Sequence, residues 1–294
     1  MRTLQAILVS TRPAQWVKNL FVAAPVLFAK AHTSEDPALI LRAMLAVLVF
    51  VLLSGAVYLM NDVLDAERDR RHPVKCRRPV ASGVLDPAVA VAAGLLCLAS
   101  ALAAGIGLGA EFQVAALAYL VLNVGYSLSF KNLPYLDVLT IATGFLLRIL
   151  AGSFAIGLRA EEISYFLVAC TFLVALFLAI GKRIVEFKAD NGALTRAVLG
   201  RYRFEHLQVA LWVSGALTAV AYGLYTIAPR TTAYFGHHRL VGSFPFVLVG
   251  LWRFAHLVRH SHAAQSPTDA MIRDRWFVLN VLAWFGVVVW AVYG

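Results

Sequence analysis

The chain has 294 residues, is 61% hydrophobic and only 14% charged, and carries a formal net charge of +10. A mean hydropathy of +0.75 excludes an ordinary soluble globular domain and indicates a protein embedded in a lipid bilayer. We expect no nucleic-acid partner, because basic residues collect in the cytoplasmic loops of membrane proteins whatever their function.

Apolar runs of about twenty residues can cross the ~30 Å hydrocarbon core as helices. The first run is the most polar, since Lys18, Asn19 and Pro25 interrupt it. Continuous apolar runs without period-two alternation exclude a β-barrel. The sequence therefore predicts an all-α, polytopic membrane protein, with one domain over residues 1–294 and nine spans. In chain order, these spans cover about residues 14–31, 38–63, 86–108, 112–130, 135–157, 162–184, 204–228, 240–258 and 272–292.

Lysine and arginine residues are distributed unequally between the predicted loops. With the N-terminus inside the cell, twenty lie on the cytoplasmic side, five lie outside, and Arg148 lies within a span. This asymmetry predicts a protein of the inner (plasma) membrane with a cytoplasmic N-terminus and an external C-terminus.

An acidic run, NDVLDAERD, follows the second predicted span at residues 61–69. Asn61, Asp65 and Asp69 recur every four residues, and Asp62 lies three positions before Asp65, so a helix would present all four side chains on neighbouring faces. Carboxylates stacked in this way repel each other, so positive charge has to lie among them. Either the arginines of the same segment or a divalent cation would supply it.

A second acidic run, GKRIVEFKAD, ends the sixth predicted span at residues 181–190. Glu186 and Asp190 lie four residues apart there, and Lys182 and Arg183 precede them. Two carboxylate runs at one membrane face, each flanked by cations, suit Mg²⁺ bridged to a phosphorylated substrate. Zinc is not expected, since no His or Cys cluster has ligand spacing.

These two runs resemble the aspartate-rich motifs of the UbiA superfamily of intramembrane prenyltransferases. NDVLDAERD followed by RRPVASG is similar to the first motif, and GKRIVEFKAD occupies the place of the second, with Glu186 in place of its leading aspartate. Four blocks resemble, more narrowly, the decaprenyl-phosphate phosphoribosyltransferase branch. They are RPAQWVKN (12–19), YLMNDVLDAERDRRHPVKCRRPVASG (58–83), GKRIVEF (181–187) and IRDRW (272–276).

The resemblance implies a Mg²⁺-dependent enzyme that transfers a phosphoribosyl group from phosphoribosyl pyrophosphate to a polyprenyl phosphate, and it makes a homo-oligomer plausible. It implies that the metal is held by Asn61, Asp62, Asp65 and Asp69. The same three aspartates and Glu186 would be the catalytic residues, with Glu186 and Asp190 positioning a second metal or the ribose hydroxyls. The implied substrate-binding residues are Lys18, Asn61, Arg71, Lys75, Arg78, Tyr126, Lys131, Arg148, Lys182 and Arg183.

Several alternatives remain open at this point. Each loop cation could instead contact lipid headgroups, and Tyr126 could be an interfacial anchor. Arg148 lies inside a span, where an unpaired cation is costly, so its partner is either a phosphate or an acid on another helix. The whole protein could also be a UbiA-type prenyltransferase with an aromatic acceptor, or a transporter of a phosphorylated lipid. The number of basic residues favours the phosphoribosyl reaction, because it assembles three anionic groups.

Overall fold

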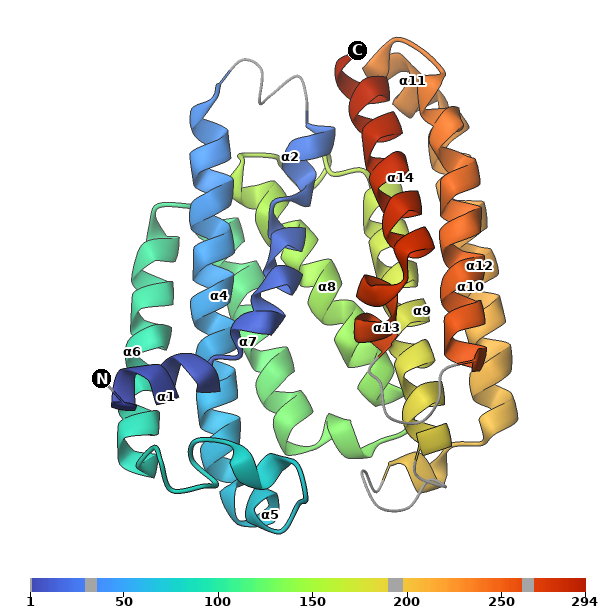
Figure 1. Ribbon diagram of the computed structural model, residues 1–294. Helices are drawn as coiled ribbons and strands as arrows, with labels where there is room; N and C mark the ends of the chain where they lie inside the picture. The colour runs from blue at the N-terminus through green and yellow to red at the C-terminus, as the bar shows by residue number, and fades with distance from the viewer. Residues whose placement is uncertain (1, 30–35, 190–197, 261–266) are drawn as a thin grey trace. The chain divides into compact units, whose positions relative to one another are not determined.

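The structure is a computed structural model that describes residues 2–29, 36–189, 198–260 and 267–294. All regular elements in these ranges are helices, which confirms the all-α prediction (Figure 1). The residues form two compact units, and the single domain expected from the sequence stays a prediction. Unit 1 contains Met1–Ser127 and Leu147–Ile163, and unit 2 contains Leu128–Leu146 and Ser164–Gly294.

Eight helices in the described ranges are long and apolar enough to cross a membrane. Their number and hydropathy show an integral membrane protein, and they coincide with the second to ninth predicted spans. These helices are α4 (Ala38–Leu64), α6 (Pro87–Ile106), α7 (Ala110–Leu128), α8 (Leu136–Ala155), α9 (Tyr165–Ala189), α10 (Phe204–Ile227), α12 (Phe244–His260) with the preceding η5 (Arg239–Ser243), and α14 (Arg275–Tyr293).

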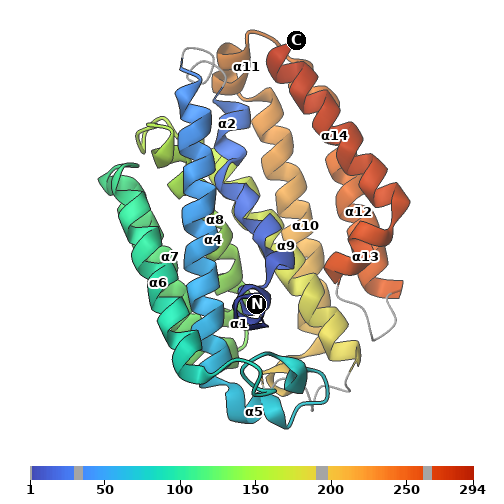
Figure 2. The same cartoon turned by 60° about the vertical axis from the view of Figure 1, so that its left-hand side comes forward.

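The first predicted span differs from the expectation because it is not one continuous α-helix. It consists of the 3₁₀-helix η1 (Pro13–Val22) and the short helix α2 (Ala24–Phe28). Both elements lie beside α4 in unit 1 (Figures 1 and 2). Pro25 lacks the backbone N–H that a continuous helix would need. This segment therefore forms two short helices in place of the single long helix that the sequence predicted.

A glycine in α8 permits close contact with this interrupted segment. A Cβ at Gly152 would lie 1.7 Å from the carbonyl oxygen of Val22, so η1 and α8 meet backbone to backbone. Any larger side chain at position 152 would have to push the two elements apart.

Shorter helices connect and flank the long ones. Helix α1 contacts α4; it crosses α4 in Figure 1 and is seen nearly end on in Figure 2. Helix α5 follows the end of α4 directly. The short elements are α1 (Arg2–Ser10), α5 (Ala66–Arg70), η2 (Lys75–Arg77), η3 (Phe130–Asn132), η4 (Leu199–Arg201), α11 (Pro229–Phe235), η5 (Arg239–Ser243) and α13 (Pro267–Arg273).

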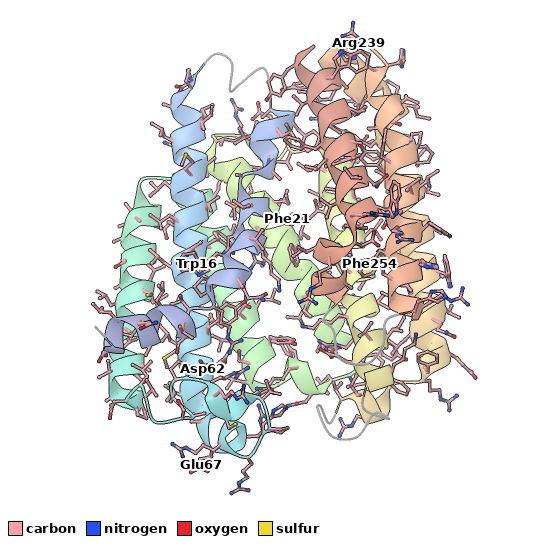
Figure 3. All side chains as sticks on the ribbon, in the orientation of Figure 1. Trp16, Phe21, Asp62, Glu67, Arg239 and Phe254 are labelled. Atoms are coloured by element: carbon pink, nitrogen blue, oxygen red, sulfur yellow. The ribbon has the colours of Figure 1, made fainter. Side chains whose placement is uncertain are left out.

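Each unit has its own apolar core. In unit 1 the ring of Phe50 on α4 packs against those of Phe112 and Tyr119 on α7, at centroid distances of 6.2 and 5.0 Å. In unit 2 the rings of Phe177 on α9 and Phe254 on α12 lie 5.0 Å apart, and Figure 3 labels Phe254. These aromatic contacts fix the helices that carry the polar residues described next.

Candidate functional site

Two buried carboxylates at the end of α4 and in α5 share one arginine. Asp62 and Asp69 are 2% and 1% exposed. One guanidinium nitrogen of Arg78, NH1, lies 3.4 Å from Asp62 Oδ1 and 2.6 Å from Asp69 Oδ2. Arg12 NH2 donates a hydrogen bond of 2.7 Å to Asp62 Oδ1. We call these four residues of unit 1 the first cluster.

Local backbone structure brings the first cluster together. Helix α4 ends at Leu64, Asp65 leaves the helical conformation with φ −94° and ψ 2°, and α5 begins at Ala66. The chain then turns through η2, which places Arg78 beside both aspartates. In Figure 3, Asp62 lies at the lower end of α4, and Glu67 of the same run projects beyond it.

Arg12 is a member of the first cluster that the sequence analysis did not predict. It lies immediately before Pro13 with φ 55° and ψ 69°, a left-handed conformation that is unfavourable for a residue other than glycine. Its guanidinium lies 4.6 Å from the ring centroid of Tyr58, a cation–π contact. The position of Arg12 in the block RPAQWVKN could have identified it, but Lys18 was the only residue of that block that was expected to bind substrate.

The predicted four-residue metal cluster is only partly formed. Asp65 places a carboxylate oxygen 2.8 Å from Arg68 NH2, and Asn61 is half-buried on α4. Helix α4 ends at Leu64, although helical backbone hydrogen bonds continue from Asp65 N–H to Asn61 O and from Asp69 N–H to Asp65 O. Among the described residues, no group of three His, Cys, Asp or Glu side chains is placed to hold a metal ion.

The two remaining carboxylates nevertheless fit a magnesium ion. Asp62 Oδ1 and Asp69 Oδ2 face the same guanidinium nitrogen of Arg78, and both are hard oxygen donors of the kind that Mg²⁺ prefers. Mg²⁺ commonly binds through one or two carboxylates and completes its shell with water and substrate phosphates. Arg12 and Arg78 are half-exposed at the same point, so their charge is available to anionic groups as well as to the aspartates.

A second polar group of unit 1 surrounds Arg148 of α8. Arg148 is buried; its Nε donates to Asn19 Oδ1 at 3.1 Å and its NH2 donates to the Tyr119 hydroxyl at 2.8 Å. Asn19 Nδ2 in turn donates to Ser54 Oγ at 3.1 Å. The sequence predicted a phosphate or an acid as the partner of Arg148, whereas these contacts are to an amide and a phenol. They tie η1 to α4, α7 and α8.

A second acidic cluster lies in unit 2, where Arg183 of α9 is buried between two carboxylates. Its Nε lies 2.7 Å from Asp137 Oδ2, and its NH1 bonds to Glu186 Oε2. The Tyr202 hydroxyl donates to Asp137 Oδ1. Lys182 Nζ lies 3.9 Å from Glu186 Oε1. We call these residues the second cluster.

The structure changes the predicted role of Arg183 and adds two residues to the site. Arg183 is fully buried and its guanidinium contacts two acids, whereas the sequence analysis expected a substrate phosphate as its partner. Asp137 and Tyr202 were not predicted, because they lie outside the acidic runs and are joined to Arg183 only by the fold. Burial raises the pKa of the Tyr202 phenol, and the hydrogen bond to Asp137 raises that pKa further.

The other predicted residues keep their roles as predictions. Arg71 is exposed, and Asp190 lies outside the described residues. The half-buried members of the predicted substrate-binding set are Lys18, Lys75, Tyr126, Lys131 and Lys182.

Comparisons with known proteins agree over nearly the whole chain. Residues 19–278 match the UbiA prenyltransferase family. The decaprenyl-phosphate phosphoribosyltransferase of Corynebacterium glutamicum is 32% identical over 290 residues, which cover 96% of this chain and 85% of that protein. The protein of the same description from Mycolicibacterium smegmatis is 30% identical over 306 residues, covering 99% and 93%.

Solved structures show the same fold. A UbiA homolog from Archaeoglobus fulgidus bound to GPP and Mg²⁺ superposes with a TM-score of 0.74 at 19% identity, covering 98% of this chain and all of that one. A structure of digeranylgeranylglyceryl phosphate synthase gives a TM-score of 0.68 at 15% identity, covering 99% and 97%. At this identity the likeness concerns the arrangement of helices.

Proposed function

The chain belongs to the UbiA prenyltransferase family, and from that premise we propose that it transfers 5-phosphoribosyl from phosphoribosyl pyrophosphate to decaprenyl phosphate and releases diphosphate. The observation that carries this proposal is the likeness to two curated decaprenyl-phosphate phosphoribosyltransferases over 96% and 99% of the chain. The geometry of the first cluster supports it, because that cluster presents the charges that a diphosphate leaving group requires.

In this proposal Asp62 and Asp69 hold Mg²⁺ in the first cluster. The ion, when bound, neutralises negative charge on diphosphate oxygens. Asn61 and Asp65 stand one turn apart around the end of α4 and are proposed to support the same ion through water or substrate. The metal requirement of this chain remains part of the proposal, and the Mg²⁺ bound to the archaeal homolog supports it at the level of fold.

The reaction breaks the bond between ribose C1 and the diphosphate oxygen and forms a bond from C1 to an oxygen of the lipid phosphate. Negative charge develops on the leaving diphosphate while C1 gains oxocarbenium character. Fixed cations that lie near the leaving group stabilise this transition state more than the ground state. Arg12 and Arg78, half-exposed beside the two aspartates, are placed to do so.

The attacking phosphate is already ionised near neutral pH, so the reaction needs no strong general base. The chain's contribution is therefore to bind and orient three anionic groups: the diphosphate, the 5-phosphate and the lipid phosphate. The cations proposed to contact them, beyond the first cluster, are Lys18, Arg71, Lys75, Lys131 and Lys182.

We further propose that the enzyme lies in the plasma membrane with the Asp62 end of α4 on the cytoplasmic side. The excess of lysine and arginine residues in the loops at that side supports this orientation. Phosphoribosyl pyrophosphate is a water-soluble, highly charged substrate, so it has to approach from an aqueous compartment.

Diphosphate release from phosphoribosyl pyrophosphate tests the proposal. Purified enzyme with Mg²⁺ should release diphosphate only when decaprenyl phosphate is present, and the radiolabelled ribose should appear in the lipid fraction. Release from a prenyl diphosphate with an aromatic acceptor, and none from phosphoribosyl pyrophosphate, would instead identify an aromatic prenyltransferase. Lipid binding without any release would favour a transporter.

A further inference from the structure

We infer that Asp137 and Tyr202 are positioning residues that act through Arg183 to hold the carboxylate of Glu186 for the ribose end of the substrate. This inference rests on the proposed function, since it assigns a purpose to contacts around a residue expected in the substrate site. It adds two residues from outside both acidic motifs.

The burial of the second cluster is the first argument. Asp137 and Arg183 are fully buried in unit 2, and removal of a charged side chain from water is unfavourable until contacts within the protein offset it. An apolar pair of the same volume would stabilise the unit at least as well. The presence of these charges therefore points to a role other than stability.

The balance of charge is the second argument. Arg183 carries one positive charge, whereas Asp137 and Glu186 together carry two negative charges. Arg183 contacts Asp137 through its Nε and Glu186 through NH1. Lys182, whose Nζ lies 3.9 Å from Glu186 Oε1, supplies a second positive charge, so the four side chains balance, and Glu186 and Lys182 are the half-exposed members. A pair that served only the core would need no third, outward-facing acid.

The attachment of the cluster is the third argument, because each partner is itself held in place. The Tyr202 hydroxyl donates to Asp137 and accepts from the backbone N–H of Tyr135 at 2.7 Å. Tyr135 has φ 66°, an unfavourable conformation for tyrosine. It immediately precedes α8, the helix that carries Asp137, and its ring packs against that of Tyr202 at 5.0 Å. Tyr202 thus fixes both the start of α8 and the orientation of Asp137.

These contacts form one continuous path from the turn before α8 to Glu186. Arg183 contacts Oε2 of the Glu186 carboxylate. The other oxygen, Oε1, faces Lys182, whose Nζ lies 3.9 Å away. A carboxylate fixed at one oxygen and presented at the other can accept hydrogen bonds from sugar hydroxyls in a defined direction. The ligand class expected for Glu186 is therefore the ribose diol.

A double-mutant experiment tests this inference with purified enzyme, Mg²⁺, phosphoribosyl pyrophosphate and decaprenyl phosphate. Asp137→Asn should lower kcat/KM for phosphoribosyl pyrophosphate by about tenfold, which is the lower end of the range observed when a residue that orients a ligand is lost. Tyr202→Phe should lower kcat/KM by a smaller factor. In a Glu186→Gln background both changes should lower it by less than about twofold, because the group they orient is gone. The KM for decaprenyl phosphate should stay within about twofold throughout.

Tyr222→Phe is the matched control. Tyr222 is also a buried tyrosine of unit 2, but its hydroxyl bonds to Ser243 at 2.7 Å and to the indole nitrogen of Trp284 at 3.0 Å. Its substitution should change neither parameter. If Asp137→Asn does not yield folded protein by size-exclusion chromatography, Tyr202→Phe carries the test.

The outcomes separate the two claims. Equal fold losses in the wild-type and Glu186→Gln backgrounds would show that Asp137 and Tyr202 act on structure alone and would overturn the inference. A wild-type enzyme that releases no diphosphate from phosphoribosyl pyrophosphate would overturn the proposed function, and the inference with it.

Discussion

The two acidic clusters both combine carboxylates with arginine, but they differ in which of these groups is buried and which is exposed. In each, two carboxylates share one guanidinium. In the first cluster the acids are buried and the arginines are accessible: the Arg12 and Arg78 side chains are 31% and 28% exposed. In the second cluster the arginine is buried at 1% exposure, and an acid, Glu186, is accessible at 24%.

This inversion assigns different chemistry to the two clusters. Half-exposed arginines beside buried acids would be available to a phosphate if a metal ion were bound to the aspartates. A buried arginine beneath an accessible acid cannot exchange partners in this way and instead fixes that acid. We therefore expect the first cluster to bind anionic phosphate groups and the second to bind a neutral group that bears hydroxyls.

The largest effect is expected at the buried acids of the first cluster. Asp62→Asn should lower turnover by at least about a hundredfold, the scale lost when a group that stabilises transition-state charge is removed. Initial rates of lipid-dependent diphosphate release at saturating substrates measure this. Glu67→Gln is the control, because Glu67 belongs to the same acidic run but is exposed; it should leave turnover unchanged. Near-normal turnover of Asp62→Asn would remove that residue from the metal site.

A smaller effect is expected at the accessible arginine. Arg78→Gln should raise the KM for phosphoribosyl pyrophosphate by about tenfold, equivalent to the loss of one charge-assisted hydrogen bond of about 1.4 kcal/mol. The Mg²⁺ concentration for half-maximal rate should not rise, since Arg78 and the ion compete for the same oxygens. Arg68→Gln, which alters the exposed pair with Asp65, should leave both values unchanged. A higher Mg²⁺ requirement in Arg78→Gln would contradict the assignment of Arg78 to phosphate.

Next in size is a difference in stability between the two shared arginines. Arg183→Lys keeps the charge but loses the fork that reaches Asp137 and Glu186 together. It should therefore lower the free energy of unfolding by about 1–3 kcal/mol, the cost of leaving a buried polar group unsatisfied. Thermal unfolding in detergent measures the change. Arg78→Lys is the matched control and should shift the midpoint far less; equal shifts would contradict the difference in burial.

The sequence predicted most of the fold because hydrophobic length is a strong local signal. Eight of nine spans coincide with long helices within the described residues. Helix α6 begins close to the predicted start at residue 86, where Asp86 Oδ1 accepts from the N–H groups of Ala88 and Val89 at 2.8 and 3.4 Å. The exception is the span around Pro25, where polar residues and a missing donor divide the helix.

The candidate site was less predictable because its partners come from distant parts of the chain. Helical spacing identified the acidic run, but it could not show that Asp62 and Asp69 share Arg78 while Asp65 pairs with Arg68. Arg12 lies fifty positions from its partner Asp62. Similarly, Asp137 lies outside both acidic runs, and only the fold shows that it faces Arg183.

The smallest predicted effect concerns the pH dependence of stability in the second cluster. Burial and the bond to Asp137 raise the pKa of Tyr202 above its ordinary value, so the folded protein holds this proton more tightly than the unfolded chain. Below about pH 10 both states are protonated and the phenol contributes its full share of stability. Above that pH the unfolded state ionises first, and stability is lost as pH rises towards the folded-state pKa.

Tyr202→Phe removes this proton and should flatten that dependence. The midpoints of thermal unfolding of the wild type and of Tyr202→Phe should differ most near pH 8 and converge as pH rises above about 10. The curves would converge because only the wild type has a phenol that stays protonated in the folded state while it ionises in the unfolded state, and this difference lowers the stability of the wild type as pH rises. Parallel curves would mean that the phenol ionises equally in both states, which is incompatible with a buried hydroxyl that donates to Asp137 and would remove Tyr202 from the chain of contacts that fixes Glu186.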